Sequence, residues 1–299
     1  STTKQLESFF VETITLIAQG PLCTYPHQSV TLMFYETIVR YEKYLPENPD
    51  VLRNILIAFL DTRGIRNPNA TIRSRACYLF QRFVKNKNVA PFLESILQSV
   101  KDFLTVSFDI QKFISFDDQV NLYDALGHIV GQQLPDKVLA STYLEANISP
   151  LTKQLAEIID KKLYKSDTKD RPIFAATILQ IISCIGSYSK GFNGQKEFSP
   201  FFRTTLEVVM KVLQELPQHE EIRAKAIFYM HRMIECLGPD VLLYLPPLIA
   251  QLMMTSGPKD FVEFTRLLNQ LMSKFKEQMV PVIDTLLLQI LARLSTFMT

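Results

Sequence analysis

Apolar residues recur every three or four positions along almost all of the 299 residues. This spacing places them on one face of an α-helix, because a helix completes a turn every 3.6 residues. No sustained alternation of apolar and polar residues, the mark of a half-buried strand, interrupts it. The helical blocks end at breaks rich in Pro, Gly and Asn, such as PENPD (46–50), RNPNAT (66–71) and SGPKD (256–260). The pattern predicts an all-α protein of thirteen or so helices, with separate blocks expected at 136–146 and 150–164.

Two of these blocks are alike. The segment IRSRACYLFQRFV (72–84) aligns without a gap with IRAKAIFYMHRMI (222–234), and each is followed by a short break and another apolar helix. Recurring helix pairs are the signature of an α-solenoid, in which each pair buries its apolar face by stacking on its neighbours. The shared pattern resembles the second helix of a HEAT repeat. We therefore expect one continuous HEAT-like array over 1–299, of about six or seven helix pairs.

That HEAT resemblance implies roles for the small and the basic residue in the pattern. Ala76 and Ala226 would let neighbouring helices approach closely. Arg73 and Arg223 would belong to a structural ladder of polar contacts between successive repeats.

Composition narrows the class of protein. The chain is 47% hydrophobic and 21% charged, as in ordinary globular proteins, and its net charge is only +2. Any attraction to nucleic acid must therefore be local. The single, scattered Cys23, Cys77, Cys184 and Cys236 predict reduced, buried thiols in an intracellular protein. No uninterrupted apolar run reaches the length of a membrane span, and 241–254, the nearest, contains two prolines. The chain lacks an initiator Met and stops within a helical pattern, so we expect a fragment of something longer.

Catalytic signals are weak. No HExxH, P-loop or nucleophile-elbow motif occurs, and we expect no enzyme, no cofactor and no metal. His27, His128, His219 and His231 are interpreted as surface or satisfied core residues. Asp117 and Asp118 look like a paired carboxylate, but they directly precede an apolar helix and favour a capping role.

Positive charge is concentrated between positions 61 and 87. This segment holds seven basic residues against Asp61, a local charge of +6, while the other 272 residues sum to −4. Its basic residues are Arg63, Arg66, Arg73, Arg75, Arg82, Lys85 and Lys87. A second basic stretch, KKLYKSDTKDR (161–171), is diluted by acids, and we interpret it as a solvated loop between repeats.

A helical projection of 71–87 separates two faces. Ile72, Ala76, Leu79, Phe80 and Phe83 fall on one side, which predicts a core stripe. On the other side, within about 80°, lie Arg75, Tyr78, Arg82 and Lys85. This outer face carries no acid, whereas exposed helix faces usually mix charge signs. Cations around a tyrosine suit phosphate contact and base stacking.

Four segments, in order along the chain, then resemble the exportin-T family of the importin-β (karyopherin) superfamily. They are RSRACYLFQRFVK (73–85), SFDDQVNLYDALGHIVG (115–131), HRMIECLGPDVLLYLP (231–246) and LLNQLMSKFKEQMVPVI (267–283). The resemblance implies a HEAT superhelix that carries mature tRNA, together with Ran-GTP, from nucleus to cytoplasm. It also implies shuttling through the nuclear pore by contacts with FG-repeat nucleoporins, and no enzymatic activity. The main Ran-GTP site would lie outside this segment.

The charge pattern and the resemblance together give our functional hypothesis. We expect a tRNA-binding segment of a Ran-dependent nuclear export receptor, with no membrane and no DNA among its partners. Helix geometry and charge alone select its contact residues. They are Arg75, Arg82 and Lys85, with Tyr78, Arg63, Arg66 and Lys87. In the second copy Glu235 stands where the first has Lys85, so we place the contact on the first copy. Two alternatives stay open: a HEAT scaffold or karyopherin that binds an acidic protein cargo, and contacts between repeats only.

Overall fold

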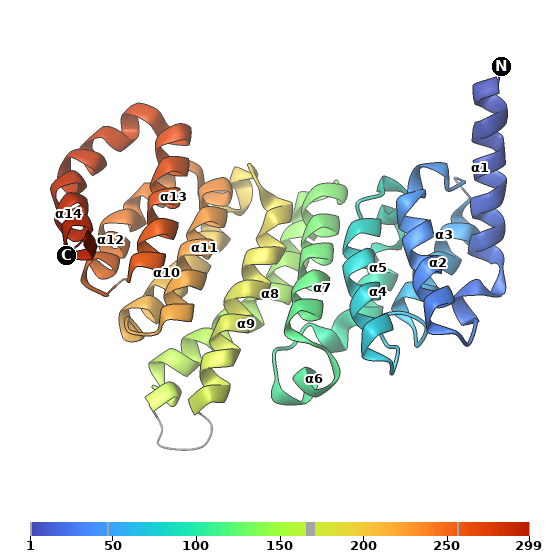
Figure 1. The fold of residues 1–299 in the computed structure, drawn as a ribbon, viewed down its shortest axis with the longest axis horizontal. Coiled ribbons are helices and arrows are strands. Elements are labelled where there is room, and N and C mark those ends of the chain that lie inside the picture. Colours follow the sequence, from blue (N-terminus) through green and yellow to red (C-terminus); the bar gives the residue numbers. More distant parts are fainter. Residues whose placement is uncertain (1, 47, 166–170, 256, 299) are drawn as a thin grey trace. The chain divides into compact units, whose positions relative to one another are not determined.

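The computed structural model describes residues 2–46, 48–165, 171–255 and 257–298 (Figure 1). All regular structure in these ranges is helical, and no strand occurs in them. The all-α solenoid predicted from the sequence is therefore confirmed. The chain divides into two compact units, residues 1–147 and 148–299. Each is described by itself below.

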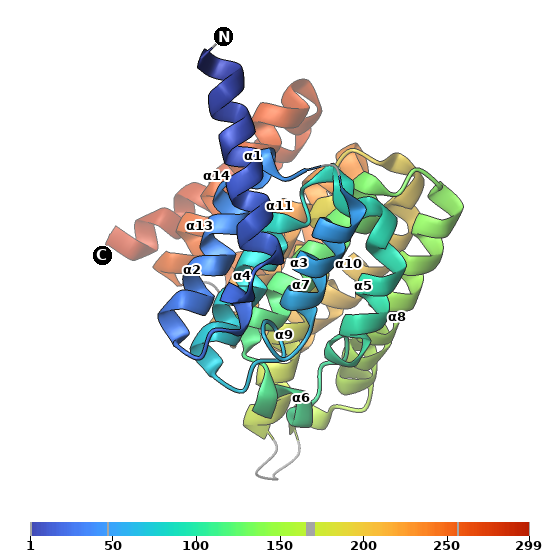
Figure 2. The ribbon, with the colours of Figure 1, turned by 90° about the vertical axis from the view of Figure 1, so that its right-hand side faces the viewer.

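The first unit arranges its helices in two layers. In one layer α4 (Ala70–Phe83) packs between α2 (Gln28–Arg40) and α7 (Phe116–His128). In the other, α3 (Pro49–Leu60) packs between α1 (Thr2–Gln19) and α5 (Leu93–Val100). The view in Figure 2 shows α2 and α4 to one side of α3 and α5. A short α6 (Phe108–Phe113) precedes α7.

The second unit repeats this layering. Helix α11 (Glu220–Leu237) packs between α9 (Arg171–Ser189) and α13 (Pro258–Phe275), and also against α10 (Ser199–Glu215). Helix α12 (Leu245–Thr255) packs against α10 and α14 (Val280–Met298). Figure 1 shows α11 beside α13. The two aligned segments of the sequence thus form equivalent central helices, α4 and α11, each flanked by two helices of its own layer.

Capping residues mark where the central helices of the two units and α7 begin or end. The side chain of Asn69 accepts hydrogen bonds from the backbone N–H groups of Thr71 (2.9 Å) and Ile72 (3.4 Å), which starts α4. Ser115 caps α7 in the same way, accepting from the N–H of Asp118. Helix α11 ends at Gly238, whose φ of 58° lies in the left-handed region that glycine adopts without strain. The sequence breaks therefore act as helix boundaries.

Two details of the predicted helix pattern are wrong. The blocks expected at 136–146 and 150–164 form one helix, α8 (Lys137–Asp160), with Pro150 inside it. Pro150 removes a backbone hydrogen bond, but a continuous buried stripe of Leu144, Ile148, Leu151 and Leu155 stabilises the helix across it. The other detail is α6, which was missed because six residues are too few to show a helical period.

The four cysteines are buried and unpaired, as the sequence predicted. Burial raises the pKa of Cys77, Cys184 and Cys236, so these thiols stay protonated at neutral pH. They behave as small apolar core residues.

Three segments are long and apolar enough to cross a membrane, judged by length and composition only. They are Pro172–Phe192, Glu220–Leu252 and Pro258–Thr296, and 67%, 44% and 11% of their most apolar windows are buried. Counting uninterrupted apolar runs in the sequence misses these segments. Scattered polar residues break such runs while the mean hydropathy stays high. The first segment contains α9, whose apolar side chains lie largely in the core.

Candidate nucleic-acid interface

Helix α4 has the two faces that its periodicity predicts. Ile72, Ala76, Phe80 and Phe83 are buried against the neighbouring helices. On the outer face Tyr78 is 39% exposed, and Arg82 and Lys85 are exposed. The structure therefore brings Arg75, Tyr78, Arg82 and Lys85 onto one surface of the first unit.

Arg63 and Arg66 belong to the packing around α3 rather than to this surface. Arg63 forms a bidentate pair with Asp61, with Nη2 at 2.6 Å and Nε at 2.9 Å from Oδ2. Arg66 binds Asp102 at 2.6 and 2.8 Å, and its guanidinium lies 4.6 Å from the centroid of the Phe103 ring. The hydrogen bonds from Arg66 lower the pKa of the Asp102 carboxyl. The charges of both arginines are thus paired with carboxylates of the same unit.

Arg75 is neutralised across the layer. Its Nε donates to Oε1 of Glu36 on α2 at 2.5 Å, and its Nη2 pairs with the same oxygen. Its guanidinium also lies 4.8 Å from the centroid of the Tyr78 ring. The outer face of α4 is acid-free in sequence, but the neighbouring helix supplies the missing carboxylate.

Arg82, Lys85 and Lys87 are the exposed cations of the segment, and they form no ion pair within the part of the chain that the structure describes. Arg82 and Lys85 lie near Glu42. Burial raises the pKa of that carboxyl, while the two cations act in the opposite direction. Lys85 also lies near His128 of α7, whose pKa is lowered by burial and by the positive charge of Lys85. The end of α4 is therefore the place where positive charge stays available to a ligand.

The two ladder arginines hold the ends of their helices. Arg73 donates from Nη1 to the carbonyl of Asn67, and Arg223 donates from Nη1 to the carbonyl of Pro217, both at 2.7 Å. Each acceptor lies six residues before its arginine. Arg223 also crosses to α13, where its Nε and Nη2 bind the buried Asp260 at 2.9 and 2.7 Å.

Helix α11 carries an aromatic–cation motif that was not predicted from the sequence. Phe228 is 43% exposed and occupies the position of Tyr78. The guanidinium of Arg232 lies 5.2 Å from its ring centroid, and Nζ of Lys225 lies 5.8 Å from it. The gap-free alignment contained this signal, because Arg75–Tyr78–Arg82 and Lys225–Phe228–Arg232 have the same spacing. It was passed over because Glu235 stands where α4 has Lys85.

The weaker basic stretch falls partly outside the described residues, which leave out 166–170. Within the rest of it, Lys161 pairs with Glu157 of the same helix, and Lys165 lies 3.8 Å from Glu215. These exposed cations are shared with acids of the same unit, in keeping with a solvated loop.

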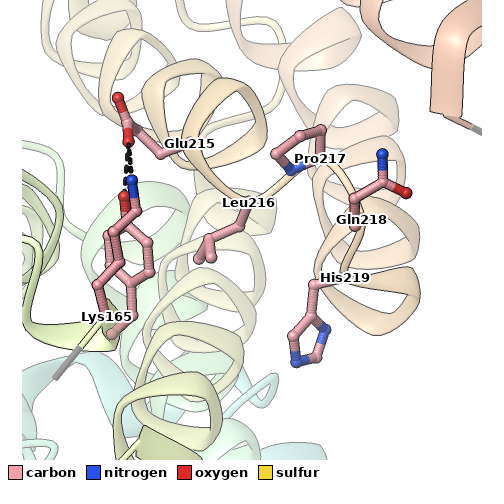
Figure 3. A pocket seen from close by; sticks show the side chains of 7 residues that line it. Lys165, Glu215, Leu216, Pro217, Gln218 and His219 are labelled. Carbon is pink, nitrogen blue, oxygen red and sulfur yellow. Dashed lines mark hydrogen bonds and ion pairs between the residues drawn. The ribbon is translucent and has the colours of Figure 1, made fainter. Parts of the chain in front are cut away.

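A pocket of about 420 Å³ lies between this stretch and the turn that joins α10 to α11 (Figure 3). The Tyr164 hydroxyl donates to Glu215 at 2.6 Å. Burial, with the nearby carboxylate, raises the pKa of Tyr164 to about 12, and the hydrogen bond from Tyr164 lowers the pKa of Glu215. At neutral pH the phenol therefore stays protonated and the carboxyl ionised. Among the described residues no group of three or more His, Cys, Asp or Glu side chains could hold a metal ion.

Comparison with known proteins gives the family. A family model described as Exportin-T matches residues 2–299. The chain belongs to the Exportin-T family. Proteins named Exportin-T share 35% identity over 98% of the chain in Dictyostelium discoideum, 34% over 89% in Arabidopsis thaliana, and 31% over 93% in Homo sapiens. The chain spans 28%, 29% and 30% of those three proteins, less than a third of an Exportin-T.

Proposed function

We propose that this chain is a tRNA-binding helical-repeat segment of a Ran-dependent nuclear export receptor. The receptor would carry mature tRNA from the nucleus to the cytoplasm and shuttle through the nuclear pore. Membership of the Exportin-T family supports the transport role. The observation that carries the RNA contact is the exposed, unpaired positive charge of Arg82 and Lys85 at the end of α4.

The contact is with the phosphate backbone. Cations on an exposed helix face attract phosphates without reading base sequence, as a receptor for many different tRNAs requires. Lys87 extends this group of cations along the chain, and Tyr78 supplies an exposed ring beside them. Arg63, Arg66 and Arg75 contribute less to RNA binding than their charges suggest, because their partner carboxylates hold them.

The proposal is tested by the salt dependence of tRNA binding in the full-length protein with Ran-GTP. Each lost phosphate contact reduces the slope of log K against log salt by roughly 0.7–0.9. Arg82→Gln combined with Lys85→Gln should therefore reduce the slope by roughly 1.5 and weaken binding most at low salt.

Lys101→Gln combined with Lys211→Gln is the matched control. It removes the same charge from exposed positions on the turn after α5 and on α10 that form no ion pair among the described residues. An equal loss in both double variants would indicate a general charge effect and would exclude α4 as a specific contact. An unchanged slope in the α4 variant would exclude it as well.

A second proposed role rests on the acids that already face α4. Glu36 pairs with Arg75, and Glu42 lies near Arg82 and Lys85, so this surface can accept carboxylates. A scaffold or a karyopherin with an acidic protein cargo would use it in that way. Competition separates the two roles: an acidic peptide that displaces tRNA at equal charge concentration would favour the protein cargo. We also infer Ran-GTP and FG-repeat nucleoporins as partners through the family, and we assign no residue of this chain to them.

A further inference from the structure

The outer face of α11 combines an exposed aromatic ring with two cations, at the spacing that α4 also has. Phe228 follows Lys225 by three residues and precedes Arg232 by four, so all three lie along one side of the helix. Both cations lie within 6 Å of the centroid of the Phe228 ring. The exposed ring of Phe228 leaves apolar surface in contact with solvent, and a ligand that covers this surface gains free energy.

The two helices that flank α11 offer this motif no carboxylate that is not already bound elsewhere. Helix α9, which packs on one side of α11, contains no acidic residue. On the other side, Asp260 of α13 binds Arg223, and Glu263 binds Arg266 of its own helix at 2.6 Å. Glu235, which aligns with Lys85 of the first copy, binds Lys274 at 2.5 Å.

The charge of Arg232 consequently remains available. It forms no ion pair among the residues that the structure describes, and its guanidinium contacts Phe228. Lys225 lies one turn after Glu221 and is a flanking charge, whereas Phe228 and Arg232 make up the stacking surface. On α4, by contrast, Glu36 holds Arg75, the cation that contacts Tyr78.

We infer that Phe228 and Arg232 form a stacking site for an unpaired nucleotide of an RNA ligand. The base would stack on the exposed surface of the Phe228–Arg232 pair, and Arg232 and Lys225 would contact the adjacent phosphates. Aromatic rings and guanidinium planes bind splayed-out bases in this way, and positive charge complements the backbone. This inference rests on the proposed RNA-binding function and adds a second contact of a different kind, directed at single-stranded RNA.

The experiment uses the full-length protein with two labelled probes of equal phosphate number, a single-stranded oligoribonucleotide and an RNA duplex. Phe228→Leu keeps an apolar side chain and removes the ring. It should weaken binding of the single strand about tenfold, with the salt slope unchanged and duplex binding unchanged. Arg232→Gln should reduce the salt slope for the single strand by roughly 0.7.

Tyr25→Leu is the matched control, since Tyr25 is 52% exposed and no cation contacts its ring among the described residues. Far-ultraviolet circular dichroism and the thermal transition report whether each variant is folded. Should Phe228→Leu unfold the protein, the slope change of Arg232→Gln still decides the question. Unchanged single-strand affinity in a folded Phe228→Leu protein, or equal losses for strand and duplex, would overturn the inference.

The outcomes also separate this inference from the proposed function. If the α11 variants bind single strands normally while the α4 double variant loses tRNA, the stacking site is wrong and the RNA-binding function stands. If the wild-type protein binds neither tRNA nor single strands, both are wrong. If Arg232→Gln weakens an acidic peptide and leaves both RNA probes unaffected, the surface binds protein and the inference is wrong.

Discussion

Helices α4 and α11 are two copies of one helix that use their polar residues differently. Both bury an apolar stripe that begins with Ile and Ala and continues with two Phe in α4 and two Met in α11. In both, an arginine donates to the backbone carbonyl six residues before it. In α11 the arginine also binds the buried Asp260 of the next helix in the layer. In α4 the corresponding carboxylate, Asp118, accepts a hydrogen bond from Ser74 at 2.8 Å, and Arg73 lies 4.7 Å from the Phe113 ring centroid.

The repeated pattern thus places the aligned arginine and carboxylate at the same positions in both copies, but it does not determine which groups they bind. Asp118 and Asp260 occupy the same place, three residues after the caps Ser115 and Gly257. What differs is the neighbouring side chain: α4 has Ser74, whereas α11 has Ala224. The extra hydroxyl gives Asp118 a donor of its own, and α6 supplies a ring on which Arg73 can pack.

The largest difference should appear when the two ladder arginines are removed. Arg223→Met leaves Asp260 buried without its counter-ion, which should lower the free energy of unfolding by about 3–5 kcal/mol. Arg73→Met breaks two hydrogen bonds to backbone carbonyls, of Asn67 and Pro68, and a ring contact, and should cost about 1–2 kcal/mol. Urea denaturation measures both. Equal losses would contradict the comparison, and Asp260→Asn should restore part of the stability of the Arg223→Met protein.

A smaller effect is expected at the hydroxyl that distinguishes α4. Ser74→Ala leaves the buried Asp118 carboxylate without this donor and should cost about 1–3 kcal/mol in the same urea experiment. Thr142→Ala is the control, because Thr142 is exposed and donates only to its own helix at Val138. A Ser74→Ala protein as stable as the control would show that Ser74 does not compensate Asp118.

Exchanging the sign at the aligned positions 85 and 235 should alter RNA binding more than stability. Glu235→Lys breaks a half-exposed ion pair with Lys274, worth about 0.2–1 kcal/mol, and adds a cation to α11. Its salt slope for tRNA should become steeper by roughly 0.7–0.9, while Lys85→Glu should make it shallower. Binding titrations at several salt concentrations measure both slopes. If neither variant changes the salt slope of tRNA binding, the ends of α4 and α11 do not contact tRNA.

The smallest effect concerns His128, which lies near Lys85. Burial and Lys85 hold the pKa of His128 below its usual 6.5, so the unfolded chain takes up a proton that the folded protein resists. Stability should therefore be full above about pH 6.5 and should decline as the pH falls below it. In Lys85→Gln the pKa of His128 should rise toward 6.5, which nuclear magnetic resonance titration of the imidazole would detect. An unchanged pKa would mean that the charge of Lys85 does not contribute to the shift.

Much of the fold followed from local pattern. The periodicity of Ile72, Ala76, Phe80 and Phe83 predicted a buried stripe, and that stripe is buried. Helix α8 shows the limit, since Pro150 looks like a boundary when read alone, whereas the packing of Leu144 and Ile148 carries the helix through it. The candidate site was less predictable, because its seven basic residues look alike in sequence.

The sequence by itself determined the helices, the repeated pair of segments and the concentration of basic residues, because these depend on spacing within a few turns of one helix. Only the tertiary structure decided which of those cations remain available. Arg66, Arg75 and Arg223 meet their carboxylates across 36, 39 and 37 residues, about one repeat along the chain. A cation without an acid on its own helix can thus be neutralised by a carboxylate about one repeat before or after it in the chain. Arg82 and Arg232 are set apart because no carboxylate of the described residues forms an ion pair with either of them.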